Sequence, residues 1–268
     1  MEEINQLKTK VSKVWKSKFR TSHFQRFQST FFVSILITII ILFSTHVNAQ
    51  ETEKKPSALS VSADIVSSYL WRGMVGSPTI SFQPSVSYNT GNVGFGFWGS
   101  VDNINYLREM DVFFTYSFKN LSFTFSDYYW DTSKKYFDYN NSTTAHVFEL
   151  GVTYKNEKFP LQVYAGTMIY GNDKVISYDT TQTNAIKNNY STYLELSYLF
   201  KINGNSLNVF VGATPYTGFY GKDFSVIFLG LTGKRDIIIT DKFTLPIWAT
   251  FAVNPQTEEY FVVMGISL

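Results

Sequence analysis

The chain has 268 residues, with 23 Lys and Arg against 21 Asp and Glu, no cysteine, and 18% aromatic residues. Only 16% of its residues are charged, compared with about 25% in a typical soluble domain. The lack of cysteine excludes a disulfide framework, a thiolate zinc site and a thiol nucleophile. With 16 Gly and 7 Pro, the chain is neither collagen-like nor of low complexity.

The first 49 residues have the pattern of a secretory signal peptide. Residues 1–30 contain seven basic residues, and a mainly apolar run over 31–43 follows them. Val47 and Ala49 occupy the −3 and −1 positions of a cleavage site before Gln50. An uncleaved signal anchor is the alternative, but an apolar run of 13 residues is shorter than the roughly 20 that span a bilayer. We therefore expect a signal peptide over 1–49 and a short periplasmic lead over 50–57.

Removing this leader changes the charge of the protein. The leader holds 7 basic and 2 acidic residues, so 16 basic and 19 acidic groups remain in residues 50–268, a net charge of −3. The sequence pI of 8.5 thus belongs largely to the leader. The exported part has no basic footprint for nucleic acid, and no nucleic-acid partner is expected.

From residue 58 onward, apolar residues recur at every second position, which is the period of a β-strand. No comparable helical period occurs there. The pattern predicts twelve strands, over residues 59–71, 80–88, 93–101, 112–118, 121–125, 148–154, 161–169, 194–200, 207–213, 227–231, 243–253 and 260–268.

The connections between these strands alternate in length. Short turns rich in Asn, Gly and Asp suit tight hairpins, and they alternate with mostly longer polar segments, of which 131–143 and 171–189 are the longest. Short turns at one rim and long loops at the other are typical of a transmembrane antiparallel up-and-down β-barrel of the outer membrane. A soluble sandwich or lipocalin-like protein is the alternative, but the second face of the strands is rich in Ser, Thr, Gly and Gln, as in a wet lumen. We therefore predict an all-β fold, with the barrel over 58–268 and both of its ends on the periplasmic, short-turn side.

The aromatic residues suggest two belts at the membrane interfaces. The expected periplasmic belt comprises Tyr88, Phe118, Tyr154, Phe200 and Phe243. The expected outer belt comprises Tyr69, Trp71, Tyr129, Tyr190 and Tyr260.

Two parts of the sequence resemble a known family. The segments 62–73 (SADIVSSYLWRG), 82–86 (FQPSV) and 96–100 (GFWGS), and near the end 229–232, 239–243, 254–255 and 263–267, are similar to the TorF-type porins of Gram-negative outer membranes. The residues 265–268 also resemble the C-terminal signal read by the barrel-assembly machinery, although Leu268 stands where Phe is usual. The resemblance implies an outer-membrane location and a barrel, and it covers little of residues 103–205.

The residues that could carry chemistry are few. His146 is the single histidine after the leader, and the positions two residues away, Thr144 and Phe148, provide no serine nucleophile. We therefore interpret His146 as a polar residue at the loop end of its strand, and expect neither an enzyme nor a catalytic residue. Asp127, Asp131 and Asp138 flank one loop, but they lack the spacing of a known calcium loop, so neither a metal site nor a cofactor is expected.

The inward face carries the functional hypothesis. Its expected lumen-lining residues are Asp64, Arg72, Trp98, Asp111, Glu149, Lys155, Tyr164, Tyr193, Glu195, Lys201 and Trp248. Rings and paired charges serve a solute-conducting pore, but they also fill a narrow barrel, and packing is the favoured role. Glu149 and Glu195 are expected to neutralise Lys155 or Lys201.

We predict a porin-like passive channel for small polar solutes. The expected partners are outer-membrane lipids and lipopolysaccharide, the barrel-assembly machinery through the C-terminal strand, and an unknown small polar solute. The alternatives are a non-conducting structural or surface-binding barrel that acts through its extracellular loops and, third, a barrel enzyme.

Overall fold

The computed structural model describes residues 58–268 except 104–107, 132, 157 and 178–184. The expected signal peptide over 1–49 and the lead over 50–57 lie outside these residues. No helix in the described ranges is long and apolar enough to cross a membrane.

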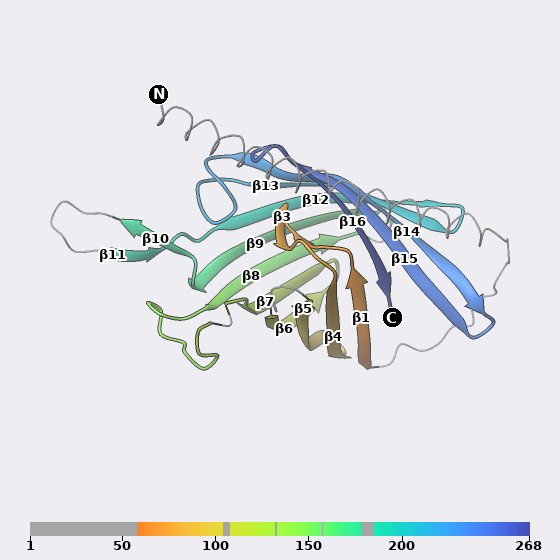
Figure 1. Ribbon diagram of the computed structural model, residues 1–268, viewed down its shortest axis with the longest axis horizontal. Helices are drawn as coiled ribbons and strands as arrows, with labels where there is room; N and C mark the ends of the chain where they lie inside the picture. The colour runs from red at the N-terminus through yellow and green to blue at the C-terminus, as the bar shows by residue number, and fades with distance from the viewer. Residues whose placement is uncertain (1–57, 104–107, 132, 157, 178–184) are drawn as a thin grey trace, which may run out of the picture. The chain divides into compact units, whose positions relative to one another are not determined.

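Twelve strands close into one antiparallel barrel (Figure 1), and this confirms the predicted fold class. In barrel order they are β1 (Leu59–Val66), β16 (Glu259–Ser267), β15 (Phe243–Asn254), β14 (Ser225–Thr240), β13 (Asn205–Thr214), β12 (Thr192–Ile202), β9 (Leu161–Gly171), β8 (His146–Lys155), β7 (Leu121–Tyr129), β6 (Arg108–Phe118), β5 (Val93–Asp102) and β4 (Ser81–Thr90). The strands β9 and β12 are neighbours in the barrel. The gap in their numbering arises because β10 and β11 form a separate hairpin between them in the chain.

Four more short strands form two hairpins in the long connections. The pair β2 (Tyr69–Trp71) and β3 (Met74–Ser77) lies between β1 and β4, and the pair β10 (Lys174–Ser177) and β11 (Ala185–Asn188) lies between β9 and β12. Figure 1 shows β10 and β11 extending beyond the end of β9. By contrast, side chains of the β2–β3 hairpin pack against residues of the barrel interior.

The barrel closes between its first and last strands. The register pairs Asp64, Ile65 and Val66 with Ser267, Ile266 and Gly265. Two backbone hydrogen bonds, of 3.1 and 2.8 Å, join Ala63 and Leu268 next to these pairs. The C-terminal residues therefore complete the wall, and without them β1 and β16 would present open edges.

The alternation of the sequence becomes two faces of the wall. The outward side chains are mostly Phe, Leu, Val and Tyr, and a large fraction of each is exposed on every strand of the barrel. The inward residues differ along the barrel axis: near the long loops they are buried, and near the short turns Ser and Thr are partly exposed. We call these two regions the long-loop half and the short-turn half.

Three residues of the expected outer belt are placed differently. Tyr69 and Tyr129 are only 8% and 6% exposed, and Trp71 packs against the interior cluster. The prediction of an interfacial position was therefore wrong for Tyr69 and Trp71, and Tyr129 is covered. The chain leaves the wall after Val66 and turns inward, so strand alternation no longer determines the face of Tyr69 and Trp71. Tyr129 does face outward, but the segment after β7 covers it, and its hydroxyl donates to the Lys134 carbonyl at 2.7 Å.

The remaining belt residues, Tyr190 and Tyr260 at the long-loop end and all five at the short-turn end, are exposed. The strand around Lys234 and Arg235 continues without a break, opposite Trp248 and Ile247. The irregularities of β14 instead lie beside Ile227, where Gly212 pairs with Phe228 and Ala213 with Val226, and near its end at Ile238 to Thr240.

Candidate functional site

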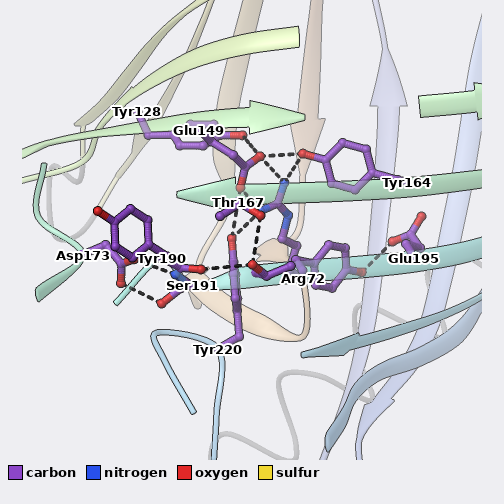
Figure 2. A network of polar contacts seen from close by, with 12 residues as sticks. Arg72, Tyr128, Glu149, Tyr164, Thr167, Asp173, Tyr190, Ser191, Glu195 and Tyr220 are labelled. Carbon is purple, nitrogen blue, oxygen red and sulfur yellow. Dashed lines mark hydrogen bonds and ion pairs between the residues drawn. The ribbon is translucent and has the colours of Figure 1, made fainter. Parts of the chain in front are cut away.

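The centre of the long-loop half is an ion pair between the β2–β3 hairpin and the barrel wall. Arg72 lies in the hairpin turn, where it has a φ of 49° and is followed by Gly73 with a φ of 77°. Its Nη1 and Nη2 donate to the two carboxylate oxygens of Glu149 on β8, at 2.5 and 2.7 Å (Figure 2). This is the two-point geometry that makes Arg the preferred partner of a carboxylate.

Gly73 permits this placement of the turn. A Cβ at position 73 would lie 2.0 Å from the Ile227 carbonyl oxygen, so the hairpin approaches the bulge of β14 too closely for any other residue. The Asn254 side-chain amide also donates to the Gly73 carbonyl at 3.1 Å. The backbone conformation of 72–73 thus holds the guanidinium inside the barrel.

Three tyrosines complete the shell of the Glu149 carboxylate. The hydroxyls of Tyr128 and Tyr164 donate to Oε1 at 3.0 and 2.5 Å, and that of Tyr220 donates to Oε2 at 3.3 Å. Arg72 in turn donates to the hydroxyls of Tyr164 and Tyr220. Burial is the largest influence on the Tyr220 phenol and raises its pKa well above the usual value of 10.0, so this loop residue remains a hydrogen-bond donor at neutral pH.

Aromatic rings pack around the ion pair. The Arg72 guanidinium carbon lies 4.5 Å from the ring centroid of Trp71 and 4.8 Å from that of Tyr193, within the range of a cation–π interaction. Trp71 also contacts Tyr128, Trp130 and Tyr220 edge-on or tilted. The charges are therefore satisfied inside a packed set of rings, with Glu149 only 1% exposed.

A second polar group fixes the loop that carries Tyr220. The buried carboxylate of Asp173 accepts the backbone N–H and the hydroxyl of Ser191 at 2.8 and 2.7 Å. The Ser191 hydroxyl oxygen accepts the Phe219 N–H at 2.7 Å. The Phe219 hydrogen bond therefore ties the loop between β13 and β14 to Ser191, which Figure 2 shows beside Asp173, and Tyr220 is held over the lumen.

His146 lies outside this cluster, on the outward register of β8. Its Nδ1 lies 2.7 Å from Asp127 Oδ1 and its Nε2 lies 2.5 Å from the Tyr136 carbonyl oxygen. Both ring nitrogens are therefore engaged, one by a carboxylate oxygen and the other by a carbonyl oxygen. No nitrogen is left to act as a general base, and the geometry gives His146 the role of attaching the segment 133–144 to the wall.

The predicted site residues fall into two groups. The Arg72 cluster brings together Arg72, Glu149, Tyr164 and Tyr193, and Tyr193 donates to Glu195 at 2.6 Å. Trp98 and Asp111 pair across β5 and β6, where Trp98 contacts Tyr69. Asp64 pairs with Gln83 on β4, and Lys155, Lys201 and Trp248 lie on the inward register toward the short turns.

The expected pairing of Glu149 with a lysine was wrong, because Arg72 of the hairpin binds both oxygens of its carboxylate. Sequence reasoning also missed Tyr128, Asp173 and Tyr220. The adjoining Arg72 and Gly73 offered a signal for the inward turn, whereas nothing in the loop sequences indicated that Tyr220 and Asp173 would act together. Within the described ranges, no three His, Asp or Glu residues lie close enough to hold a metal ion, and Asp127 is engaged by His146.

Comparisons with known proteins add little to this geometry. No family model matches the sequence, and no curated protein matches it, so the TorF-type resemblance stays a prediction. A solved structure described as the Salmonella typhi OmpF complex with daunomycin is similar at a TM-score of 0.33 and 10% identity. The alignment covers 71% of this chain and 62% of that chain, so the protein spans less than two thirds of its length. At this level the similarity assigns neither a family nor a function; the fold itself defines the class, a closed antiparallel β-barrel.

Proposed function

We propose that the protein is an outer-membrane β-barrel that passes small polar solutes through a narrow pore, with the Arg72 cluster as its constriction. The observation that carries the location is the belt of exposed apolar side chains around a closed barrel. In a closed barrel the backbone N–H and C=O groups of every strand form hydrogen bonds within the wall, which the hydrocarbon core of a membrane requires. Lipids and lipopolysaccharide would contact this belt, and the assembly machinery would bind the C-terminal strand.

The short-turn half supports a solute path. Its inward residues are small and polar, and pairs such as Thr115 with Thr124 and Ser117 with Ser122 hydrogen-bond across strands while staying partly exposed. Water therefore reaches the inner wall from the short-turn rim. The Arg72 cluster in the long-loop half then limits the size of the solutes that pass.

A non-conducting barrel that acts through its loops is the second candidate. The observation that favours it is the satisfied ion pair and its ring of aromatic contacts across the long-loop half. In that case the β2–β3 hairpin would be a permanent plug, and binding would belong to exposed loop residues such as Phe137 and Phe224.

Conductance of the purified protein in planar bilayers separates the two candidates. The pore predicts small, reproducible channel events from the unmodified protein. Deleting 69–77, replaced by a short Gly-Ser linker, should increase the conductance several-fold. If neither protein conducts while both remain folded, the pore proposal is wrong; if only the deletion conducts, the hairpin is a plug.

A further inference from the structure

One row of inward residues in the short-turn half combines two lysines, a hydroxyl and an indole. The register places Lys201 on β12 opposite Ser206 on β13, and Ser206 opposite Lys234 on β14. Lys234 in turn lies opposite Trp248 on β15. Since neighbouring strands are about 4.8 Å apart, the two lysine Cα atoms are separated by roughly 10 Å, with Ser206 between them.

The indole of Trp248 has a fixed position. A Cβ on Gly265, its partner on β16, would lie 2.3 Å from Cε2 and Cζ2 of the ring and 2.8 Å from Nε1. The ring therefore lies against the backbone of β16, along the wall. Because it remains partly exposed, one face of the ring is available to a solute.

The two ammonium groups are available as well. Among the described residues, neither Lys201 nor Lys234 has a hydrogen-bond or ion-pair partner, and both are exposed. The nearest acidic groups along their own strands are Glu195, which accepts the Tyr193 hydroxyl, and the exposed Asp236. In this respect the row differs from Arg72, whose charge is neutralised by Glu149.

The geometry points to a binding site for organic anions that carry a ring with a flat apolar face, such as sugar acids. The carboxylate would lie between Lys201 and Lys234, within reach of the Ser206 hydroxyl. The ring would stack on the indole of Trp248, as apolar faces do on aromatic side chains. This inference names the substrate class of the proposed pore, but the site stands on its own residues.

Galacturonate and methyl galactoside test the site, since both present a similar sugar ring and only the first is charged. Binding to the detergent-solubilised barrel is measured by calorimetry. We expect galacturonate to bind more tightly than methyl galactoside. Lys201→Gln and Lys234→Gln should each weaken the binding of galacturonate by up to about fivefold, as for exposed ion pairs. The double variant should weaken it further.

Trp248→Leu should weaken the binding of both sugars by about two- to tenfold. Lys155→Gln is the matched control, because it removes an inward, exposed ammonium at the same end of the barrel from a strand outside the row. It should change galacturonate binding by less than about twofold. Each variant is first checked for the heat-dependent gel shift of a folded barrel.

The inference is overturned if both sugars bind equally, if neither binds, or if Lys155→Gln weakens galacturonate as much as the row variants. These outcomes are separate from failure of the pore. If the protein binds galacturonate but does not conduct, the pore proposal is wrong and the binding site stands. Conductance without any preference for chloride over potassium, together with absent binding, would remove the site and leave the pore.

Discussion

The two halves of the barrel lumen are built from the same strands but solve different problems. In the long-loop half, Glu149, Tyr193 and Met168 are at most 1% exposed, and a hairpin and a loop from outside the wall add Trp71, Arg72 and Tyr220 to the side chains of the strands. In the short-turn half, Ser, Thr and Lys line a wall that water reaches. In this barrel, inserted chain thus adds to the filling of the long-loop half, whereas inward side chains nearer the short turns remain partly exposed.

The largest effect should come from breaking the ion pair. Glu149→Ala leaves Arg72 buried without a counter-charge, and should reduce the free energy of unfolding by about 3–5 kcal/mol, measured by urea denaturation in detergent. Glu195→Ala is the control, because this carboxylate is partly exposed on the inner wall, and it should reduce the free energy of unfolding by less. The double variant Arg72→Met with Glu149→Leu should be more stable than either single change; a double variant as unstable as the sum of both would contradict the ion-pair account.

Gly73→Ala tests whether the backbone of the hairpin fixes the Arg72 cluster. The positive φ and the approach to the Ile227 carbonyl predict a loss of about 2–3 kcal/mol and a more permeable lumen. Gly91→Ala is matched to it, because Gly91 also has a positive φ, of 54°, but nothing lies within 4 Å of a Cβ there. Equal losses for the two variants would show that the close approach does not matter.

The boundary between the halves is tested on a single strand. Thr124 and Ser126 both face inward on β7, but Ser126 lies beside Phe113 and Glu149 and is buried, whereas Thr124 is partly exposed. Ser126→Trp should overpack the filled half and cost about 1–3 kcal/mol. Thr124→Trp should be tolerated and should reduce conductance; a Ser126→Trp barrel of unchanged stability would place the boundary elsewhere.

Tyr220→Phe should have the smallest effect, about 1 kcal/mol, because it removes one hydroxyl from the shell of Glu149. The folded-state pKa of Tyr220 is raised above 10.0, so its contribution is complete below pH 10 and is lost as the pH rises through the raised value. Unfolding midpoints of the unmodified protein should therefore be constant between about pH 7 and 9 and fall above about pH 10. The unfolding midpoint of the variant should fall less steeply with pH above about pH 10. Identical slopes for the two proteins would exclude Tyr220 as a contributor to this pH dependence.

The sequence by itself determined the wall. A period of two from residue 58 onward and turns of alternating length predicted twelve strands and the barrel, because each strand must separate an apolar from a polar face. In the structure the expected belt residues at the short-turn end are exposed, and the register places Lys201 and Trp248 on the inward face. These are local properties, which depend on the alternation within one strand.

The tertiary structure alone decided how the lumen is filled. Tyr69 and Trp71 continue the apparent alternation of β1, yet the chain leaves the wall before them. The close approach of Gly73 to Ile227 helps to place Arg72 at Glu149. The partners of this cluster lie 77 and 148 residues from Arg72 in the chain, and Tyr220 arrives on a loop fixed by Asp173. No local pattern encodes such contacts, since they arise where inserted segments from distant parts of the sequence meet inside a closed wall.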